Sequence, residues 1–269
     1  MSIKLIICDL DGTLIGEDFA LSPRVRQAAA RAQAAGIAVT LASGRGYPSL
    51  RGFARQLSVD APLIAYQGAQ TWTAGGALLE ETPLSRAHLP AAIEYCKTRG
   101  LELAVYCQDQ VYQTTRLYDD DYYAVWFGLP QVYVGDLMAA LPGDPIKYIA
   151  IAPDKAAADE IEREVRALAA GRYQVMRSHD WFVEGLDAAV SKGAAAERLA
   201  ARLGLAREEV MALGDGGNDL ALVAWAGLGV AMGNAAPAVQ DAADVIAPTQ
   251  AEDGAAWAIE RLALTGGCV

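Results

Sequence analysis

The sequence predicts an α/β protein in which a Rossmann-like parallel sheet carries helices on both faces and an α+β domain is inserted. Both ends of the chain alternate short apolar stretches with helical patterns, which is typical of a parallel sheet. The middle instead alternates apolar and polar residues, as antiparallel strands do. We therefore expect a discontinuous core formed by residues 1–80 and 188–269, with the inserted domain at residues 81–187. Both parts are of ordinary domain size.

The N-terminal third predicts a β-α-β-α-β order. A buried strand within 4–14, "KLIICDLDGTL", is followed by a helix over 22–35. Ser22 is placed to cap that helix, Pro23 occupies its first position, and Gly36 follows its end. Apolar strands within 37–45 and 61–69 then enclose a helix over 47–58.

The middle of the chain predicts a separate mixed domain. It begins with a helix over 84–100 and continues with a half-exposed antiparallel hairpin over 101–115. Later come a strand within 145–153, a helix starting at its cap Asp154, and more strand over 173–186. Between them lies an acidic aromatic segment, for which we expect a helix that buries its rings, with a sugar-stacking surface as the alternative. Its rings are those of Tyr118, Tyr122, Tyr123, Trp126 and Phe127.

The C-terminal part returns to the first pattern. A helix over 191–204 precedes a strand, loop and helix over 210–227. Short strands follow within 228–235 and 244–249, and a last helix is expected over 251–264. The chain therefore leaves an α/β core and comes back to it.

Composition excludes several classes of function. A formal net charge of −11 disfavours nucleic acid as a partner. We expect no signal peptide and no transmembrane segment, and no protein partner is evident. The cysteines lack CxxC spacing, which favours reduced thiols in a cytoplasmic protein over a zinc site. They are Cys8, Cys96, Cys107 and Cys268.

Two aspartates, Asp9 and Asp11, end the first apolar stretch with only Leu10 between them. Side chains alternate along a strand, so we expect both carboxylates on the same side. Carboxylates this close repel each other unless a proton or a cation lies between them. One could act as a nucleophile and the other as a general acid and base. The alternative is an Asx turn closed by Gly12.

Two further stretches carry groups that suit a phosphate. Ser43 and Gly44 follow a strand, where a hydroxyl and free backbone N–H groups can hold an anion, although Ser-Gly is also a common turn. Arg45 next to them suits an ion pair or a gate contact better than a phosphate contact. Lys192 opens a helix against its dipole, which suggests a charge that holds phosphate, the alternative being a solvated lysine.

The fourth stretch, "ALGDGGNDLAL", places Asp215 at the end of a strand and Asn218 and Asp219 in the following glycine loop. A carboxylate there is a good ligand for a hard cation such as Mg²⁺. The alternative is a helix cap by Asn218 or Asp219. All four stretches should lie at the carboxyl edge of one parallel sheet, where α/β folds bind ligands.

The stretches "DLDGTL", "SGR", "SKG" and "GDGGND", in this order, resemble the four motifs of the haloacid dehalogenase superfamily of phosphohydrolases. The position of the insert is similar to the type IIB cap of the Cof-type subfamily. "GVAMGNA" and "AEDGAAWAIERL" resemble that subfamily's C-terminal signature, so the resemblance covers nearly the whole chain. Gln67 and Gln250 depart from positions where the subfamily commonly has Asn.

The resemblance implies that Asp9 is phosphorylated as the nucleophile and that Asp11 is the general acid and base. It implies that Mg²⁺ is held by Asp9, by Asp215 and by the backbone carbonyl of Asp11, with Asp219 in an outer shell. The implied phosphate-binding residues are Leu10 through its N–H, Ser43, Gly44, Lys192 and Asn218.

These expectations describe a magnesium-dependent phosphatase of small phosphate monoesters, with sugar phosphates suggested only by analogy with the family. A phosphomutase of the same fold is the first alternative. A non-catalytic sugar-phosphate-binding protein is the second, although binding alone does not require both Asp9 and Asp11. A hydrolytic dehalogenase is disfavoured by Asp11. We expect the cap to select the substrate and to exclude water.

Overall fold

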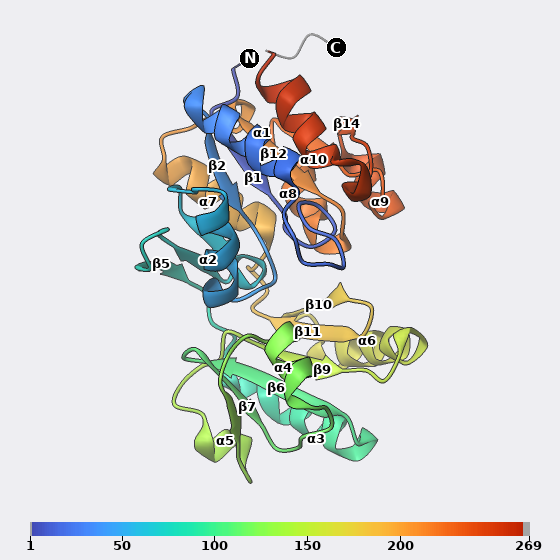
Figure 1. Cartoon of the computed structure of the whole chain (residues 1–269). Helices are drawn as coiled ribbons and strands as arrows, with labels where there is room; N and C mark the ends of the chain where they lie inside the picture. The colour runs from blue at the N-terminus through green and yellow to red at the C-terminus, as the bar shows by residue number, and fades with distance from the viewer. Residues whose placement is uncertain (1, 266–269) are drawn as a thin grey trace. The chain divides into compact units, whose positions relative to one another are not determined.

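The computed structural model describes residues 2–265, except the side chains of residues 124–126, so the interpretation of Trp126 and of Cys268 lies outside what it describes. The chain forms two compact units (Figure 1). One consists of the residues up to Glu80 together with those from Ser191 onward, and the other is Glu81–Val190. The chain thus returns to the first unit slightly later than the boundary set from the sequence.

The first unit is built on a five-stranded parallel sheet with the order β14-β13-β12-β1-β2. The strands alternate with helices along the chain, which confirms the predicted α/β class. Their bounds are β1 (Leu5–Cys8), β2 (Ala38–Leu41), β12 (Val210–Gly214), β13 (Leu228–Ala231) and β14 (Val245–Ile246).

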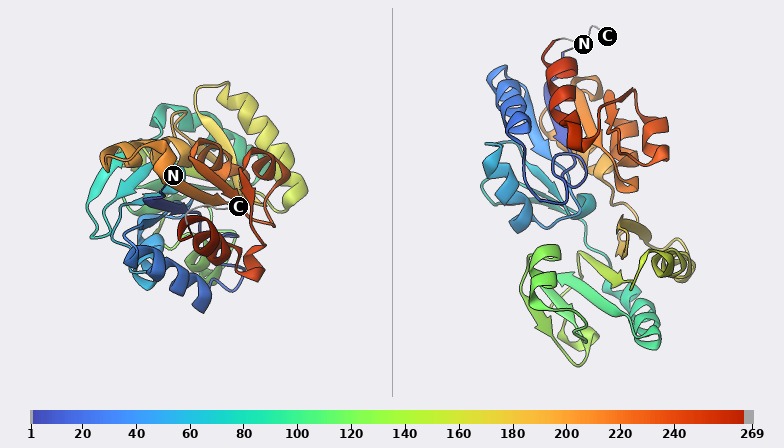
Figure 2. Two further views of the ribbon diagram at one scale, coloured as in Figure 1. Left: turned by 90° about the horizontal axis from the view of Figure 1, so that it is seen from above. Right: turned by 45° about the vertical axis from the view of Figure 1, so that its right-hand side comes forward.

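Helices cover both faces of this sheet (Figure 2). Helices α7 and α8 pack on one face against a core that includes Leu5, Ile7 and Val210, whereas α1 and α10 pack against each other on the other face. Ser22 caps α1 as expected, because its Oγ accepts the N–H of Val25 at 3.1 Å. The helices are α1 (Pro23–Ala34), α2 (Tyr47–Gln56), α7 (Lys192–Arg202), α8 (Leu220–Trp225), α9 (Pro237–Ala242) and α10 (Gly254–Ala258).

Strand β3 (Leu63–Ala65) follows β2 and α2, which confirms the predicted β-α-β-α-β order, and it lies parallel to the β2 side through a bridge between Ala42 and Ile64. The N–H of Ser43 also donates to the carbonyl of Ile64 at 3.0 Å. The second partner of β3 was not predicted, because it forms a three-stranded sheet with β4 (Gln70–Trp72) and β5 (Leu78–Glu81). The physical reason is the single 3₁₀ turn over Tyr66–Gly68, which reverses the chain directly into β4.

The last predicted helix, over 251–264, is interrupted in the structure. A short 3₁₀ turn over Gln250–Glu252 ends at Asp253, which adopts a left-handed conformation with φ 58°. Helix α10 then begins at Gly254 and continues into a π-helical turn over Ile259–Ala263. Gly254 is required because a Cβ there would lie 1.9 Å from the carbonyl oxygen of Pro248.

The second unit contains a six-stranded sheet with the order β10-β11-β9-β6-β7-β8, in which only the β7–β8 pair is parallel. Helices α3 and α6 contribute to its apolar core. The strands are β6 (Glu102–Cys107), β7 (Gln110–Gln113), β8 (Gln131–Tyr133), β9 (Lys147–Ile151), β10 (Gln174–His179) and β11 (Phe182–Leu186). The helices are α3 (Leu89–Arg99), α4 (Asp120–Trp126), α5 (Leu137–Ala140) and α6 (Lys155–Ala169), of which α5, like β8, was not predicted.

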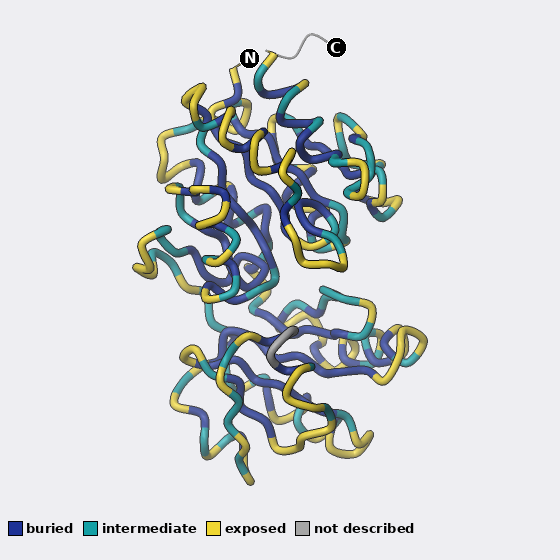
Figure 3. Tube along the Cα trace, viewed as in Figure 1, coloured by how far each residue is buried: buried dark blue, intermediate teal, exposed yellow. Residues whose placement is uncertain are grey.

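The hairpin of β6 and β7 is buried on both faces rather than half-exposed as predicted (Figure 3). One face packs on the α3 and α6 core. On the other, Tyr106 meets the ring of Phe127, and Glu102 accepts a hydrogen bond from Tyr123 at 2.7 Å. Alternation along β6 therefore reflects two buried faces, one of which is partly polar. The segment around α4 buries Tyr123 and Phe127, as the simpler interpretation expected.

Cys8, Cys96 and Cys107 are free and buried. Among the described residues, no helix has both the length and the apolar character needed to cross a membrane.

Candidate active site

Three neighbouring strands end at the same edge of the parallel sheet. Strands β1, β12 and β2 end at Cys8, Gly214 and Leu41, and the loops that follow them carry the predicted site residues. Asp9 directly extends β1, and its N–H donates to the carbonyl of Leu213 at 2.9 Å. Sheet topology therefore brings together side chains that lie about 200 residues apart in the sequence.

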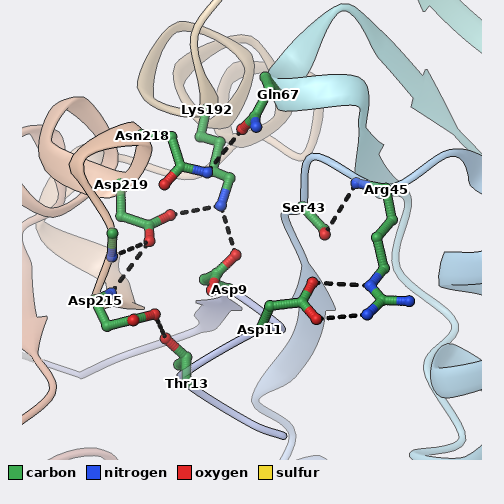
Figure 4. Close-up of polar contacts among 11 residues, drawn as sticks. Asp9, Asp11, Thr13, Ser43, Arg45, Gln67, Lys192, Asp215, Asn218 and Asp219 are labelled. Carbon is green, nitrogen blue, oxygen red and sulfur yellow. Dashed lines mark hydrogen bonds and ion pairs between the residues drawn. The ribbon is translucent and has the colours of Figure 1, made fainter. Parts of the chain in front are cut away.

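Lys192 lies at the centre of the site (Figure 4). Its Nζ donates to Asp9 Oδ1 at 2.5 Å and to Asp219 Oδ1 at 2.6 Å, and the residue is 1% exposed. Ser191 caps α7 through the N–H of Ala194, which fixes Lys192 as the first residue of that helix. Burial alone would lower the pKa of Lys192, but the carboxylates of Asp219 and Asp9 outweigh it and raise the pKa above its usual value. The side chain is therefore a buried cation, not a solvated lysine.

The neighbouring acids carry more charge than Lys192 can neutralise. Burial, together with the charge of Asp219, raises the pKa of Asp9 well above its usual value, although Lys192 acts in the opposite direction. The same two causes raise the pKa of Asp215 to about 6. Crowding of buried carboxylates therefore opposes ionisation of both groups.

Asp219 organises the loop after β12 through both of its carboxylate oxygens. Oδ1 accepts from Lys192, and Oδ2 accepts the backbone N–H groups of Asp215 and Gly216 at 3.1 and 3.0 Å. These three hydrogen bonds fix the carboxylate of Asp219 in place. Its role near a metal remains a prediction.

Two other loops contact Asp215, namely the loop after β1 and the loop after β13. Thr13 donates its hydroxyl to Asp215 Oδ1 at 2.9 Å, and Asn234 lies 3.5 Å from Oδ2 while donating to the Gly12 carbonyl at 2.9 Å. Gly12 has φ 82°, and a Cβ at this position would lie 2.3 Å from Asp215 Oδ2. Only glycine lets the two loops approach this closely.

The acids fit a divalent cation. Carboxylate oxygens of Asp9, Asp215 and Asp219 lie within 4.8 Å of one another. When all three carboxylates are ionised, they and the one ammonium carry two net negative charges in a largely buried setting, which one hard divalent ion would neutralise. The structure thus supports the expectation that these residues can hold a metal.

Asp11 lies apart from this group, which corrects the expectation that its carboxylate and that of Asp9 share one side with a cation between them. Its oxygens accept from Arg45 Nη2 at 2.6 Å and Nε at 2.8 Å, whereas Asp9 points to Lys192 (Figure 4). The reason is that β1 ends at Cys8, so strand alternation does not extend to Asp11. The side chain of Asp11 is 46% exposed, and Arg45 is its ion-pair partner.

The residues predicted to bind phosphate surround the same edge. Ser43 is buried, and its Oγ accepts the N–H of Arg45 at 3.2 Å. Leu10 is also buried, and its carbonyl accepts the N–H groups that close the turn after it. Asn218 donates its side-chain amide to Gln67 Oε1 at 3.0 Å. Their proposed contacts with a phosphate remain predictions.

Asn234 was not identified as a site residue from the sequence, although it lies in the stretch "GVAMGNA". Its Oδ1 accepts the N–H of Gln250 at 2.8 Å, so it ties the last loop to Gly12 and Asp215. In the sequence, Gln67 differs from the rest of its strand end only as a departure from the family pattern. Neither residue has a local signal, because each acts through contacts with distant loops.

Comparisons with known proteins identify the family of this chain. The model of the haloacid dehalogenase-like hydrolase family matches residues 6–259. The 5-amino-6-(5-phospho-D-ribitylamino)uracil phosphatase YcsE of Bacillus subtilis is 29% identical over 98% of this chain and 97% of its own. A second phosphatase of that name and organism, YitU, is 27% identical over 94% of each chain.

A similar solved structure is that of a haloacid dehalogenase-like hydrolase from Bacteroides thetaiotaomicron. It is 31% identical, has a TM-score of 0.84, and aligns over 96% of this chain and 99% of its own. The family match extends from the first strand to the last helical segment and includes all the loops that form the acidic edge. The chain belongs to the haloacid dehalogenase-like hydrolase family.

Proposed function

We propose that this protein is a magnesium-dependent phosphatase that hydrolyses small phosphate monoesters through a phospho-aspartate. The observation that carries the proposal is the buried Lys192 ammonium between Asp9 and Asp219, with Asp215 beside them. A binding protein would have no need to bury Asp9 and Asp219 around one lysine, with the partly buried Asp215 beside them. A phosphoryl-transfer enzyme needs a positioned anionic nucleophile and positive charge around the reacting group.

In the proposed reaction, Asp9 attacks phosphorus with a carboxylate oxygen, and the ester oxygen leaves with a proton from Asp11. Asp11 then takes a proton from the water that attacks the acyl phosphate, which releases inorganic phosphate and restores Asp9. Lys192 keeps Asp9 oriented and favours its ionised form. Because both oxygens of Asp11 accept from Arg45, this contact has to open before Asp11 can serve the substrate.

The fit of the acids supports Mg²⁺ held by Asp9, by Asp215 and by the carbonyl of Asp11, with Asp219 as an outer-shell residue. When bound, such an ion neutralises charge so that an anionic carboxylate can approach an anionic phosphate. Thr13 and Asn234 keep Asp215 in place for this purpose. Leu10, Ser43, Gly44, Lys192 and Asn218 are the proposed phosphate-binding residues.

We further propose that the substrate is a sugar phosphate or a sugar-alcohol phosphate. Support comes from the two relatives YcsE and YitU, whose names give a phosphorylated ribityl compound as the substrate. The inserted α+β unit is proposed to be a type IIB cap that selects the ester, and a cytoplasmic location agrees with the free buried thiols.

The proposal is tested by a screen for release of inorganic phosphate with Mg²⁺ and with excess chelator. The panel contains hexose, pentose and pentitol phosphates, pyridoxal phosphate, flavin mononucleotide, nucleotides and a generic aryl phosphate. We expect release that depends on Mg²⁺ and is fastest for a polyol ester. Tight binding without release, or isomerised sugar phosphate as the product, would contradict the assignment and favour a sensor or a mutase.

A further inference from the structure

The turn that follows β3 holds a side chain that the proposed reaction does not use. Tyr66 and Gln67 both adopt left-handed conformations, with φ 49° and 62°. Residues other than glycine rarely adopt this conformation, and consecutive strained residues concentrate at functional sites. Backbone hydrogen bonds from Gln67 to Ser43 at 2.9 Å and from Tyr66 to Arg45 at 3.0 Å hold the turn against the loop after β2.

This turn touches three of the loops predicted to bind phosphate. Besides its bonds to the loop of Ser43, it packs against the start of α7, where a Cβ on Gly68 would lie 2.4 Å from the carbonyl oxygen of Ser191. It meets the loop after β12 through Gln67 Oε1, which accepts from Asn218 at 3.0 Å. Gln67 therefore lies where these loops converge.

The amide nitrogen of Gln67 is buried without a hydrogen-bond partner among the described residues. The side chain is 0% exposed, and Oε1 alone is satisfied. A buried N–H donor left unpaired is strongly unfavourable, and such groups are rare unless a ligand or water completes them. The unpaired atom thus indicates a partner that joins the site.

The position of Nε2 indicates what that partner is. A Cβ on Gly44 would lie 2.4 Å from Nε2, so the amide faces the side of Gly44 that only glycine leaves open. Gly44 follows Ser43 in the loop that the sequence predicts to hold phosphate oxygens. An amide N–H directed at this place offers a neutral donor to an anion, alongside the cation of Lys192.

We propose that Gln67 is a further substrate-binding residue, whose Nε2 donates a hydrogen bond to an oxygen of the phosphoryl group beside Ser43 and Gly44, while its Oε1 orients Asn218. The proposal rests on the proposed function, because it places the phosphoryl group in that loop. It assigns two separate roles to the two ends of one amide.

A double-mutant cycle separates these roles. Gln67→Met, Asn218→Ala and the double variant are compared with wild type in kcat/KM for an aryl phosphate and in orthophosphate binding by calorimetry, both with Mg²⁺. Because a hydrogen bond to a charged group is lost, we expect Gln67→Met to weaken both by about 10- to 100-fold. The same loss should appear when Asn218 is already Ala. A loss that disappears in the Asn218→Ala background, or no loss at all, would overturn the proposal.

Two further variants serve as a matched control and as an alternative substitution of Gln67. Gln33→Met removes a partly buried amide that donates to the carbonyls of Leu57 and Ser58, and it should leave kcat/KM and orthophosphate binding unchanged. Gln67→Glu keeps the acceptor for Asn218 but removes the donor, so it should also lose phosphate binding even if Gln67→Met does not fold. Wild-type protein that binds orthophosphate through Gln67 without hydrolysing esters would contradict the proposed function and leave this inference standing.

Discussion

At the scale of single residues, Lys192 is the buried cation on which the proposed chemistry depends. It is fully enclosed, yet its ammonium has two carboxylate partners on different loops. The helix dipole alone did not distinguish Lys192 from a solvated lysine, and its proposed role came from the order of the four motifs. That it contacts Asp219 as well as Asp9 depends on how distant loops meet, which no local pattern records.

We expect Lys192→Met to reduce phosphate release by about 100- to 1000-fold, because the carboxylates lose their positioned cation. The free energy of unfolding should fall by about 3–5 kcal/mol, since breaking a buried ion pair leaves uncompensated charge. Steady-state kinetics and chemical denaturation measure the two effects. Lys155 is the matched control, because it opens α6 after a cap residue in the same way but is exposed. Lys155→Met should change neither quantity appreciably, and equal losses in both variants would contradict this account.

Gly12 provides a second test at this scale. We expect Gly12→Ala to reduce phosphate release by about 100-fold or more, because its Cβ would displace the Asp215 carboxylate. Gly36 is a matched control, since it shares φ 82° but a Cβ added there would meet no atom within 4 Å. Gly36→Ala carries the same backbone strain, so it should lose stability while kcat/KM is retained. If both variants kept full activity, the close approach of the two loops would have no catalytic meaning.

At the scale of elements, apolar runs and caps predicted where most helices and strands lie, but not which strands pair. Leu63–Ala65 lies beside the β2 side and also pairs with β4, and its apolar residues do not reveal the second partner. The pairing with β4 depends on the left-handed turn at Tyr66 and Gln67, whose sequence carries no glycine until Gly68. Likewise, the alternation in β6 did not reveal that its polar face is covered.

Glu102 at the start of β6 holds the segment that leads into α4 through hydrogen bonds. Its carboxylate accepts from Tyr123, from the Leu117 N–H at 2.8 Å, and from Gln113. Burial raises the pKa of Glu102 above its usual value, although these hydrogen bonds act in the opposite direction. Folding therefore favours the protonated form. The contribution of Glu102 to the free energy of unfolding is complete below the pKa of an unfolded glutamate. It is lost as pH rises through the higher pKa of the folded state.

We accordingly expect the melting temperature of wild type to fall relative to that of Glu102→Gln as pH rises from about 4 to about 8. Thermal unfolding of both proteins across this range, followed by circular dichroism, measures the difference. Glu160→Gln, which alters an exposed side chain of the same unit, controls for general charge effects. If wild type instead gains stability relative to Glu102→Gln as pH rises, the raised pKa of Glu102 is contradicted.

At the scale of the whole molecule, the chain divides into two units, each with its own apolar core. The return of the α/β pattern after the insert made this division predictable, because only non-local pairing can place β12 beside β1. The acidic composition is partly explained by the site itself, where carboxylates gather at one sheet edge.

Metal binding should stabilise the folded chain. We expect Mg²⁺ to raise the melting temperature of wild type, with about 1.4 kcal/mol added for each tenfold increase above the dissociation constant. Asp215→Asn should lose most of this effect. Potassium chloride at equal ionic strength is the control, because a chain of net charge −11 also responds to screening. Equal stabilisation by both salts, or by Mg²⁺ in both proteins, would argue against a metal at Asp215.

The central claim is that Asp9 becomes phosphorylated, and one measurement tests it most directly. Wild type and Asp9→Asn are each mixed with Mg²⁺ and a monoester carrying radiolabelled phosphate, and the reaction is quenched with acid within a single turnover. We predict label on the wild-type protein, removed by hydroxylamine as expected for an acyl phosphate, and neither label nor phosphate release with Asp9→Asn. Phosphate release by Asp9→Asn at the wild-type rate, with no label on either protein, would contradict the account.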